Sequence, residues 1–153
     1  KRLSLNVLMN GVSGNEIMNG TNVRIDYAEG QANNIRREAY AEAWRPDAPS
    51  TTYPRVGYKK EAQALAVSDR QVEDGSYFRI SNVTLAFDLT VENSNVFSRA
   101  NIYLSGNNLL TITDYSGYNP EITSFMNNGN ILGTEWNGYP NARTFTLGIN
   151  LDF

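Results

Sequence analysis

The clearest pattern in the chain is a regular alternation of apolar and polar residues at its end. From Thr144 to Phe153 the odd positions carry Phe, Leu, Ile, Leu and Phe, and the even positions carry Thr, Thr, Gly, Asn and Asp. Successive side chains of a β-strand point to opposite faces, so this segment has one apolar face and one polar or small face. The pattern predicts a strand over residues 144–153.

Three earlier segments alternate in the same way and are expected to be strands. They comprise residues 1–9, 81–89 and 100–110. Leu8 interrupts the first, and residues 77–80, just before the second, are mixed and are expected to rise above the apolar band. The connections are long, short and long in turn: residues 11–76, 91–99 and 112–142. Such loops are uncommon in compact soluble domains, whereas long loops on one rim and short turns on the other are typical of outer-membrane β-barrels.

The first long loop is predicted to contain a short helix. It extends over residues 35–44, with Asn33 or Asn34 as its N-terminal cap and Pro46 as its stop. We expect this helix to fold the loop onto the rim of the sheet rather than to bind a ligand.

Alternation alone also suits a soluble β-sandwich, but three observations favour a membrane barrel. The polar faces consist mainly of Thr, Asn, Ser, Gly and Ala, where a face in bulk water usually carries Lys and Glu. A strand of about ten residues, rising ~3.3 Å per residue at a tilt of about 45°, covers ~23 Å of an apolar band of roughly 25 Å. Phe153 is aromatic and lies on the apolar face. A soluble, secreted β-sandwich that binds carbohydrate remains the alternative.

Composition narrows the classes of function further. The 153 residues carry a net charge of −3 and their basic residues are scattered, so the sequence indicates no basic patch that would bind nucleic acid. The chain has neither Cys nor His, which removes disulfides, thiolate metal sites and histidine-based catalysis. The sequence does not begin with a signal peptide, so an exported protein would need residues before these, and we expect the chain to be a fragment.

Acidic residues offer only weak candidates for chemistry. Glu73, Asp74 and Glu92 could suggest the paired carboxylates of a glycosidase, but nothing fixes their separation and loop acids are usually solvated. We therefore expect no enzyme activity and no cofactor. A calcium site using Asp114, Asn119 and Glu121 lacks the spacing of an EF-hand, and no metal site is assigned.

The last strand also carries a short motif. Thr146, Gly148, Leu151 and Phe153 match a polar-x-Gly-x-x-apolar-x-aromatic ending. It resembles the C-terminal signal read by the machinery that assembles outer-membrane barrels, which would recognise an exposed edge strand by strand addition.

Several blocks in order resemble one family over nearly the whole chain. They are residues 74–85, 105–109, 115–121 and 139–148, together with Trp44-Arg45-Pro46 and Tyr53-Pro54-Arg55. The order and content of these blocks are similar to the C-terminal region of SusC/RagA-like TonB-dependent outer-membrane transporters of Bacteroidota. Asn119 stands where the family suggests Asp, and the turn after Leu89 lacks an expected Pro.

This resemblance implies the fold, location and partners. Residues 1–153 would be the C-terminal part of a β-barrel of roughly twenty-two strands, with the plug and earlier strands outside the chain. The whole protein would import glycans, oligopeptides or similar large nutrients across the bacterial outer membrane. Its expected partners are a SusD-like surface lipoprotein, the TonB complex through absent N-terminal segments, the barrel-assembly machinery at the last strand, and the lipid bilayer.

Two sets of residues are candidates for contact with a substrate. The polar face of the central strands should face the barrel lumen and could bind substrate, plug or water; it comprises Asn82, Thr84, Asn101, Tyr103, Ser105 and Asn107. Aromatic residues of the last long loop could stack on sugars, meet the lipoprotein or pack within the loop; they are Tyr115, Tyr118, Trp136 and Tyr139. For both sets the structural roles are favoured over substrate binding.

Overall fold

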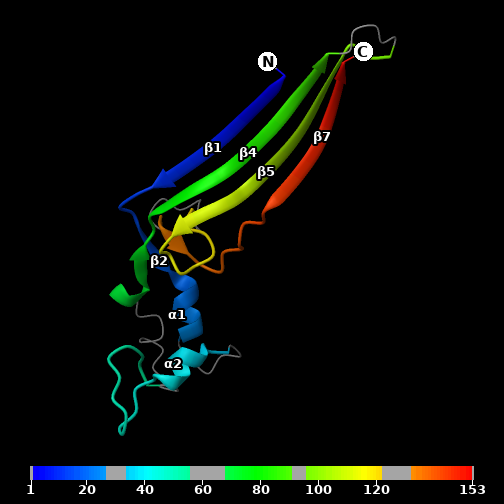
Figure 1. Ribbon diagram of the computed structural model, residues 1–153. Helices are drawn as coiled ribbons and strands as arrows, with labels where there is room; N and C mark the ends of the chain where they lie inside the picture. The colour runs from blue at the N-terminus through cyan, green and yellow to red at the C-terminus, as the bar shows by residue number, and fades with distance from the viewer. Residues whose placement is uncertain (1, 27–33, 56–67, 91–95, 122–131, 153) are drawn as a thin grey trace. The chain divides into compact units, whose positions relative to one another are not determined.

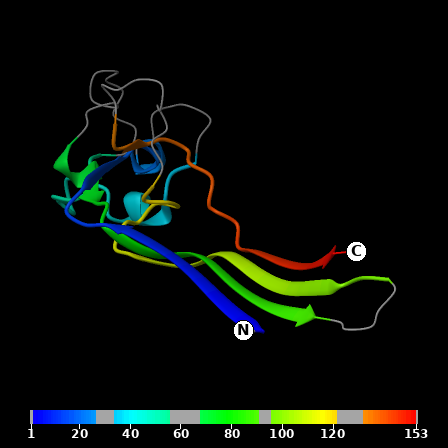
Figure 2. The same ribbon diagram turned by 90° about the horizontal axis from the view of Figure 1, so that it is seen from above.

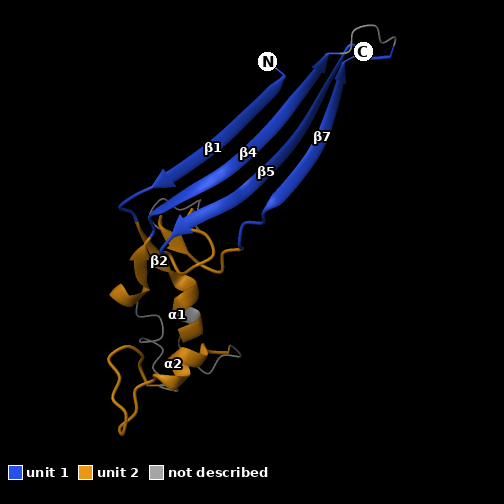
Figure 3. Ribbon diagram, in the orientation of Figure 1, with its two compact units in different colours: residues 1–15, 75–114, 140–153 blue, residues 16–74, 115–139 orange. Residues whose placement is uncertain are grey.

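The structure is a computed structural model that describes residues 2–26, 34–55, 68–90, 96–121 and 132–152. The chain divides into two compact units, coloured separately in Figure 3. Unit 1 comprises residues 1–15, 75–114 and 140–153, and unit 2 comprises residues 16–74 and 115–139.

Unit 1 is a four-stranded antiparallel sheet. Its strands are β1 (Leu3–Val12), β4 (Tyr77–Thr90), β5 (Arg99–Thr113) and β7 (Thr144–Asp152), in the order β1-β4-β5-β7. They lie side by side in Figures 1 and 2. Within unit 1, each strand therefore pairs with the next one along the chain, which is the meander of an up-and-down barrel. The expected all-β class and its four strands are confirmed, although β1 also includes Gly11 and Val12, and β5 includes Ile112 and Thr113, which were placed in the two long loops.

The register places like residues opposite one another on each face. Leu85 pairs with Leu5 and Leu104, and Leu104 pairs with Leu147, which gives one apolar row across the sheet. The neighbouring row, on the other face, is polar throughout and consists of Asn6, Thr84, Ser105 and Thr146. The apolar row is open, since Leu5 and Leu147 are 65% and 73% exposed.

A β-bulge explains the mixed stretch 77–80. Asn82 pairs with Leu8 and Ile80 with Met9, so Ser81 is an extra residue relative to β1. The bulge shifts the alternation by one position and keeps Ile80 on the apolar face, opposite Met9 and Leu110. Residues 77–80 are thus a regular part of β4, and the pattern looks mixed because its phase changes at Ser81.

Unit 2 is built from the two long connections, which the alternation pattern indicated only as separate loops. Its small sheet has the order β3-β2-β6, with β2 (Glu16–Asn19) antiparallel to β3 (Val72–Asp74) and parallel to β6 (Thr134–Glu135). The helices are α1 (Gly20–Asp26), α2 (Arg37–Ala41) and the 3₁₀ turn η1 (Asp69–Gln71). Its core contains Ile17, Val23, Ala39 and Ala43. Because β6 joins β2, the second loop completes the fold of the first.

The predicted helix of the first loop is present but shorter. It extends over Arg37–Ala41, with Arg36 at the N-cap and no side-chain capping bond, so capping by Asn34 is wrong. Asn33 lies outside the described residues. The amide of Arg36 donates to the Ile25 carbonyl at 2.8 Å, which holds the chain extended up to that point. The amide of Trp44 donates to the Tyr53 carbonyl at 3.1 Å, so the chain has left the helix before Trp44. Within the described residues, no helix is long and apolar enough to cross a membrane.

Candidate functional site

Four of the six side chains predicted to face the lumen form one hydrogen-bonded cluster on β4 and β5. The Asn82 amide donates to Ser105 Oγ at 2.9 Å and to Asn107 Oδ1 at 2.8 Å. The Thr84 hydroxyl donates to Asn82 Oδ1 at 2.9 Å and lies 2.8 Å from Ser105 Oγ. These partly buried groups satisfy one another across the strands, which stabilises the sheet and leaves a neutral, hydroxyl- and amide-rich surface.

The polar face continues to both sides of this cluster. Asn101 donates to Asp88 Oδ1 at 2.8 Å and accepts from Asn150 at 3.4 Å. Asn107 donates to Thr144 Oγ1 at 3.1 Å. The structure therefore places all six predicted residues on one face, where most of their bonds are to each other and to neighbouring strands. Such a surface can hydrogen-bond water or a polar solute without presenting a strong charge.

Arg79 is a member of this face that sequence reasoning missed. It is 3% exposed, its Nε donates to Thr111 Oγ1 at 2.9 Å, and its guanidinium lies 5.5 Å from the centre of the Tyr77 ring. Simple alternation from Asn82 would have put Arg79 on the apolar face. The bulge at Ser81 turns Arg79 to the polar side. The signal for this in the sequence was an Arg at a position where the alternation predicts an apolar residue.

Tyr103 lies across Gly148 on the polar face, on β5 and β7. The two residues are directly paired, and a Cβ on Gly148 would collide with the Tyr103 ring. The glycine of the C-terminal motif is thus needed for packing within the sheet. The other members are Thr146 on the polar face, Leu151 on the apolar face, and Phe153, which lies outside the described residues.

Gly148→Val should lower the free energy of unfolding of the sheet by about 1–3 kcal/mol, the usual cost of overpacking. Thermal unfolding of the complete protein in detergent would measure the loss. In a double-mutant cycle with Tyr103→Ala, the two losses should be clearly less than additive, because the collision disappears with the ring. Asn150→Val, on the same face of β7, is the matched control and should be nearly neutral; additive losses would contradict the packing role of Gly148.

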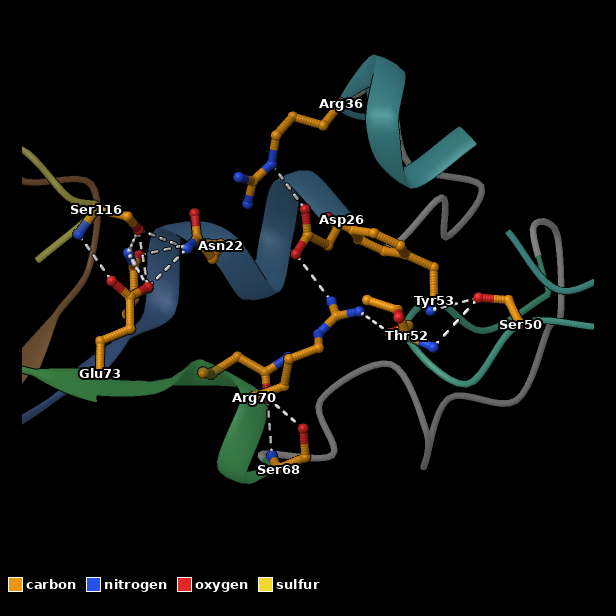
Figure 4. Close-up of polar contacts among 12 residues, drawn as sticks. Asn22, Asp26, Arg36, Ser50, Thr52, Tyr53, Ser68, Arg70, Glu73 and Ser116 are labelled. Atoms are coloured by element: carbon orange, nitrogen blue, oxygen red, sulfur yellow. Dashed lines mark hydrogen bonds and ion pairs between the residues drawn. The ribbon is translucent and has the colours of Figure 1, made fainter. Parts of the chain in front are cut away.

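In unit 2, Glu73 joins residues from both long connections. Its Oε1 accepts from Asn19 Nδ2 at 3.0 Å, Asn22 Nδ2 at 2.9 Å and Ser116 Oγ at 2.9 Å. Its Oε2 accepts from the backbone amide of Ser116 at 2.8 Å. Figure 4 shows Asn22 and Ser116 converging on this carboxylate. Both oxygens are occupied, which does not fit the free acid or base of a glycosidase.

Asp26 is a second junction of unit 2 and is also drawn in Figure 4. Its Oδ1 accepts from Arg36 Nε and its Oδ2 from Arg70 Nη2, both at 2.8 Å, while the Asp26 side chain is only 6% exposed. The Arg70 guanidinium also donates to the Thr52 carbonyl and stacks 4.5 Å from the centre of the Tyr53 ring. One buried carboxylate thereby ties α1 to α2, to η1 and to the segment at Thr52.

The four aromatic residues predicted in the last long loop have different environments. Tyr115 is 5% exposed and its ring covers Gly117. Burial, reinforced by the charges of Glu135 and then Glu73, raises the pKa of Tyr115 well above its usual value. Trp136 packs against Gly20, where a Cβ would collide with the indole. Only Tyr118 and Tyr139, at 64% and 84% exposed, present most of their rings to the surroundings.

The described residues offer no metal centre: nowhere among them do three carboxylate, imidazole or thiolate groups gather closely enough to hold an ion. Asn119, considered for calcium, is 4% exposed and its Oδ1 accepts from the Glu121 amide at 3.1 Å. Glu92 lies outside the described residues.

Comparison with known proteins connects the chain to a family. No family model matches it. Over its full length it is 32% identical to TonB-dependent receptor P3 of Formosa agariphila, and over 68% of its length it is 29% identical to TonB-dependent receptor SusC of Bacteroides thetaiotaomicron. The structure of the RagAB peptide transporter matches the whole chain with a TM-score of 0.78 and 27% sequence identity.

The matched proteins are much longer than this chain. It spans 15% of the length of receptor P3 and 16% of the matched RagAB chain. The order of strands in unit 1, its open apolar face and its neutral polar face agree with a place in the wall of such a transporter. The chain therefore belongs to the SusC- and RagA-like TonB-dependent receptors and matches one segment of their length.

Proposed function

We propose that residues 1–153 form the C-terminal part of the β-barrel of an outer-membrane importer that takes up glycans, oligopeptides or similar large nutrients. The observation that carries this proposal is the two-sided sheet of unit 1. One face exposes aliphatic and aromatic side chains in continuous rows, while the other carries mutually bonded amides and hydroxyls. A barrel wall needs this division, because one face meets lipid and the other meets an aqueous lumen.

The proposed partners follow from the similarity to SusC and to RagAB. A SusD-like lipoprotein would act at the cell surface, and TonB would deliver energy through segments outside these residues. Co-purification of the lipoprotein with the intact receptor, solubilised from outer membranes, tests the first partnership. In the same proposal, the C-terminal motif (Thr146, Gly148, Leu151 and Phe153) serves the barrel-assembly machinery, which would recognise the backbone and alternate side chains of an edge strand.

Leu147→Arg should prevent or weaken barrel insertion. The Leu147 side chain is 73% exposed on the apolar face, and Arg near the bilayer midplane of a barrel costs about 2–4 kcal/mol. Asn150→Arg, on the polar face of the same strand and outside the C-terminal motif, is the matched control and should insert nearly normally. The amount of heat-modifiable, folded receptor in outer membranes measures the effect. Equal levels for both variants would argue against lipid contact at Leu147.

Cysteine labelling separates this function from a soluble sandwich, in which Leu147 would be buried in protein. The chain has no Cys, so Leu147→Cys and Thr146→Cys introduce unique labelling sites within it. A fluorophore at position 147 should be quenched by brominated lipids, and one at position 146 should not. A soluble, lipid-independent protein with position 147 shielded would refute the membrane function.

A further inference from the structure

Unit 2 contains an open cleft that the proposed barrel function does not use. Its volume is about 420 Å³. It is lined by Trp44, residues 50–55 and residues 68–70. All of these residues belong to unit 2 and to the described part of the chain. None of the six residues predicted to face the lumen lines it.

The side chains that line the cleft are held in place by contacts within unit 2. Arg70 is held by Asp26, by the Thr52 carbonyl and by stacking on Tyr53. Ser50 Oγ accepts from the amides of Thr52 and Tyr53, both at 3.2 Å, and so shapes the other wall as a tight turn. A site whose side chains are already ordered loses little entropy when a ligand binds. Figure 4 shows Ser50, Tyr53 and Arg70 in this arrangement.

Several groups in the lining remain available to a ligand. The Ser50 hydroxyl accepts two amides and keeps its own proton to donate. The exposed Asp69 carboxylate and Arg55 guanidinium form no ion pair with another described residue. Trp44 is 36% exposed and supplies an aromatic surface with an N–H donor. The cleft thus combines an apolar ring with both donors and acceptors.

We propose that this cleft binds one sugar residue of a neutral oligosaccharide, an inference that rests on the proposed import function and names a substrate class for it. A pyranose has apolar C–H faces that pack on an indole, and hydroxyls that both donate to a carboxylate and accept from a guanidinium or hydroxyl. Arg70 is already engaged by Asp26, by the Thr52 carbonyl and by the Tyr53 ring. The two charges of the lining that are left for a ligand, on Asp69 and Arg55, are opposite, so they do not select a charged polymer of either sign. A peptide would be favoured by deep apolar pockets for its side chains. This lining consists mostly of hydroxyl-bearing and charged residues, so it fits a peptide less well.

Hydrogen exchange of the intact receptor, purified in detergent, tests the proposal with neutral hexaoses of glucose and xylose as probes. At least one of them should slow exchange of the amides at 50–53 and 68–71. Trp44→Ala should weaken the binding of that sugar at least about tenfold. Tyr40→Ala removes a 58% exposed aromatic residue that does not line the cleft, and it should leave affinity unchanged.

Because Trp44→Ala could loosen unit 2, Asp69→Asn provides a second, nearly isosteric test, with Asp47→Asn as its control.

The outcomes separate this inference from the proposed function. Protection elsewhere in the receptor, with Trp44→Ala and Asp69→Asn binding like the wild type, would overturn the cleft and leave the importer intact. Protection of the cleft by unmodified hexapeptides but by none of the sugars would overturn the ligand class. Absence of the protein from the outer membrane would overturn the importer itself.

Discussion

Asp26→Ala should lower the free energy of opening of unit 2 by about 3–5 kcal/mol, because removing one partner of a buried ion pair leaves the others uncompensated. The Asp26 carboxylate is almost fully buried and receives one guanidinium on each oxygen, from Arg36 and Arg70. Without it, two positive charges would remain close together with no anion between them. Hydrogen exchange in the intact receptor would detect this as exchange in α1 and η1 that is roughly two hundred to several thousand times faster.

Two variants check the cause of that loss. Asp26→Asn keeps the shape and one acceptor but removes the charge, so its effect should lie between those of the wild type and Asp26→Ala. Asp47→Ala removes an exposed carboxylate for which no ion pair is present among the described residues, and it should be neutral. If Asp26→Ala changed exchange no more than Asp47→Ala does, the junction would contribute little to the stability of unit 2.

The strands of unit 1 could be predicted because their signal is local. Alternation at Thr146 and Leu147 is visible within a few residues, and the register of β5 with β7 preserves it. The bulge at Ser81 could not be read in the same way, since an extra residue is defined only relative to the partner strand. Asn108, with a φ of 52°, lies in β5 opposite this irregularity, and Asn tolerates that conformation better than most residues.

Little of unit 2 could be predicted from the sequence, because its contacts join residues that are far apart along the chain. Arg70 and Asp26 are separated by 44 positions, and no local pattern connects them. The loop aromatics show the same limit: Tyr115 and Tyr139 are equivalent as residue types, yet one is 5% and the other 84% exposed. Tyr115 becomes buried because its ring fits over Gly117, which is a property of the folded loop rather than of its composition. The resemblance to a family extended over these loops but could not assign roles within them.

Glu73→Ala should loosen both long connections together, with a loss of about 3–5 kcal/mol. Four hydrogen bonds end on this carboxylate, and bonds to charged groups contribute about 1.5–3 kcal/mol each, although they are not additive. The loss also leaves the Asn19 side chain, which is 1% exposed, with Ser116 Oγ, at 3.2 Å, as the acceptor that remains for its Nδ2 among the described residues. Hydrogen exchange should therefore accelerate in β2 and α1 and, in parallel, around Ser116.

Whether both connections exchange faster together matters more than the size of the acceleration, because it tests whether the two connections are one folding unit. Glu73 comes from the first connection and Ser116 from the second, 43 residues apart, while β6 pairs in parallel with β2. If these links make the connections cooperative, Glu73→Gln should produce a smaller but equally shared acceleration, since its amide can replace only one of the two acceptor oxygens. Glu42→Ala, which removes an exposed acid of the same unit, should leave exchange unchanged. Acceleration confined to Ser116 and its neighbours would mean that the second connection only rests on the first, and that each could change in sequence without disturbing the other.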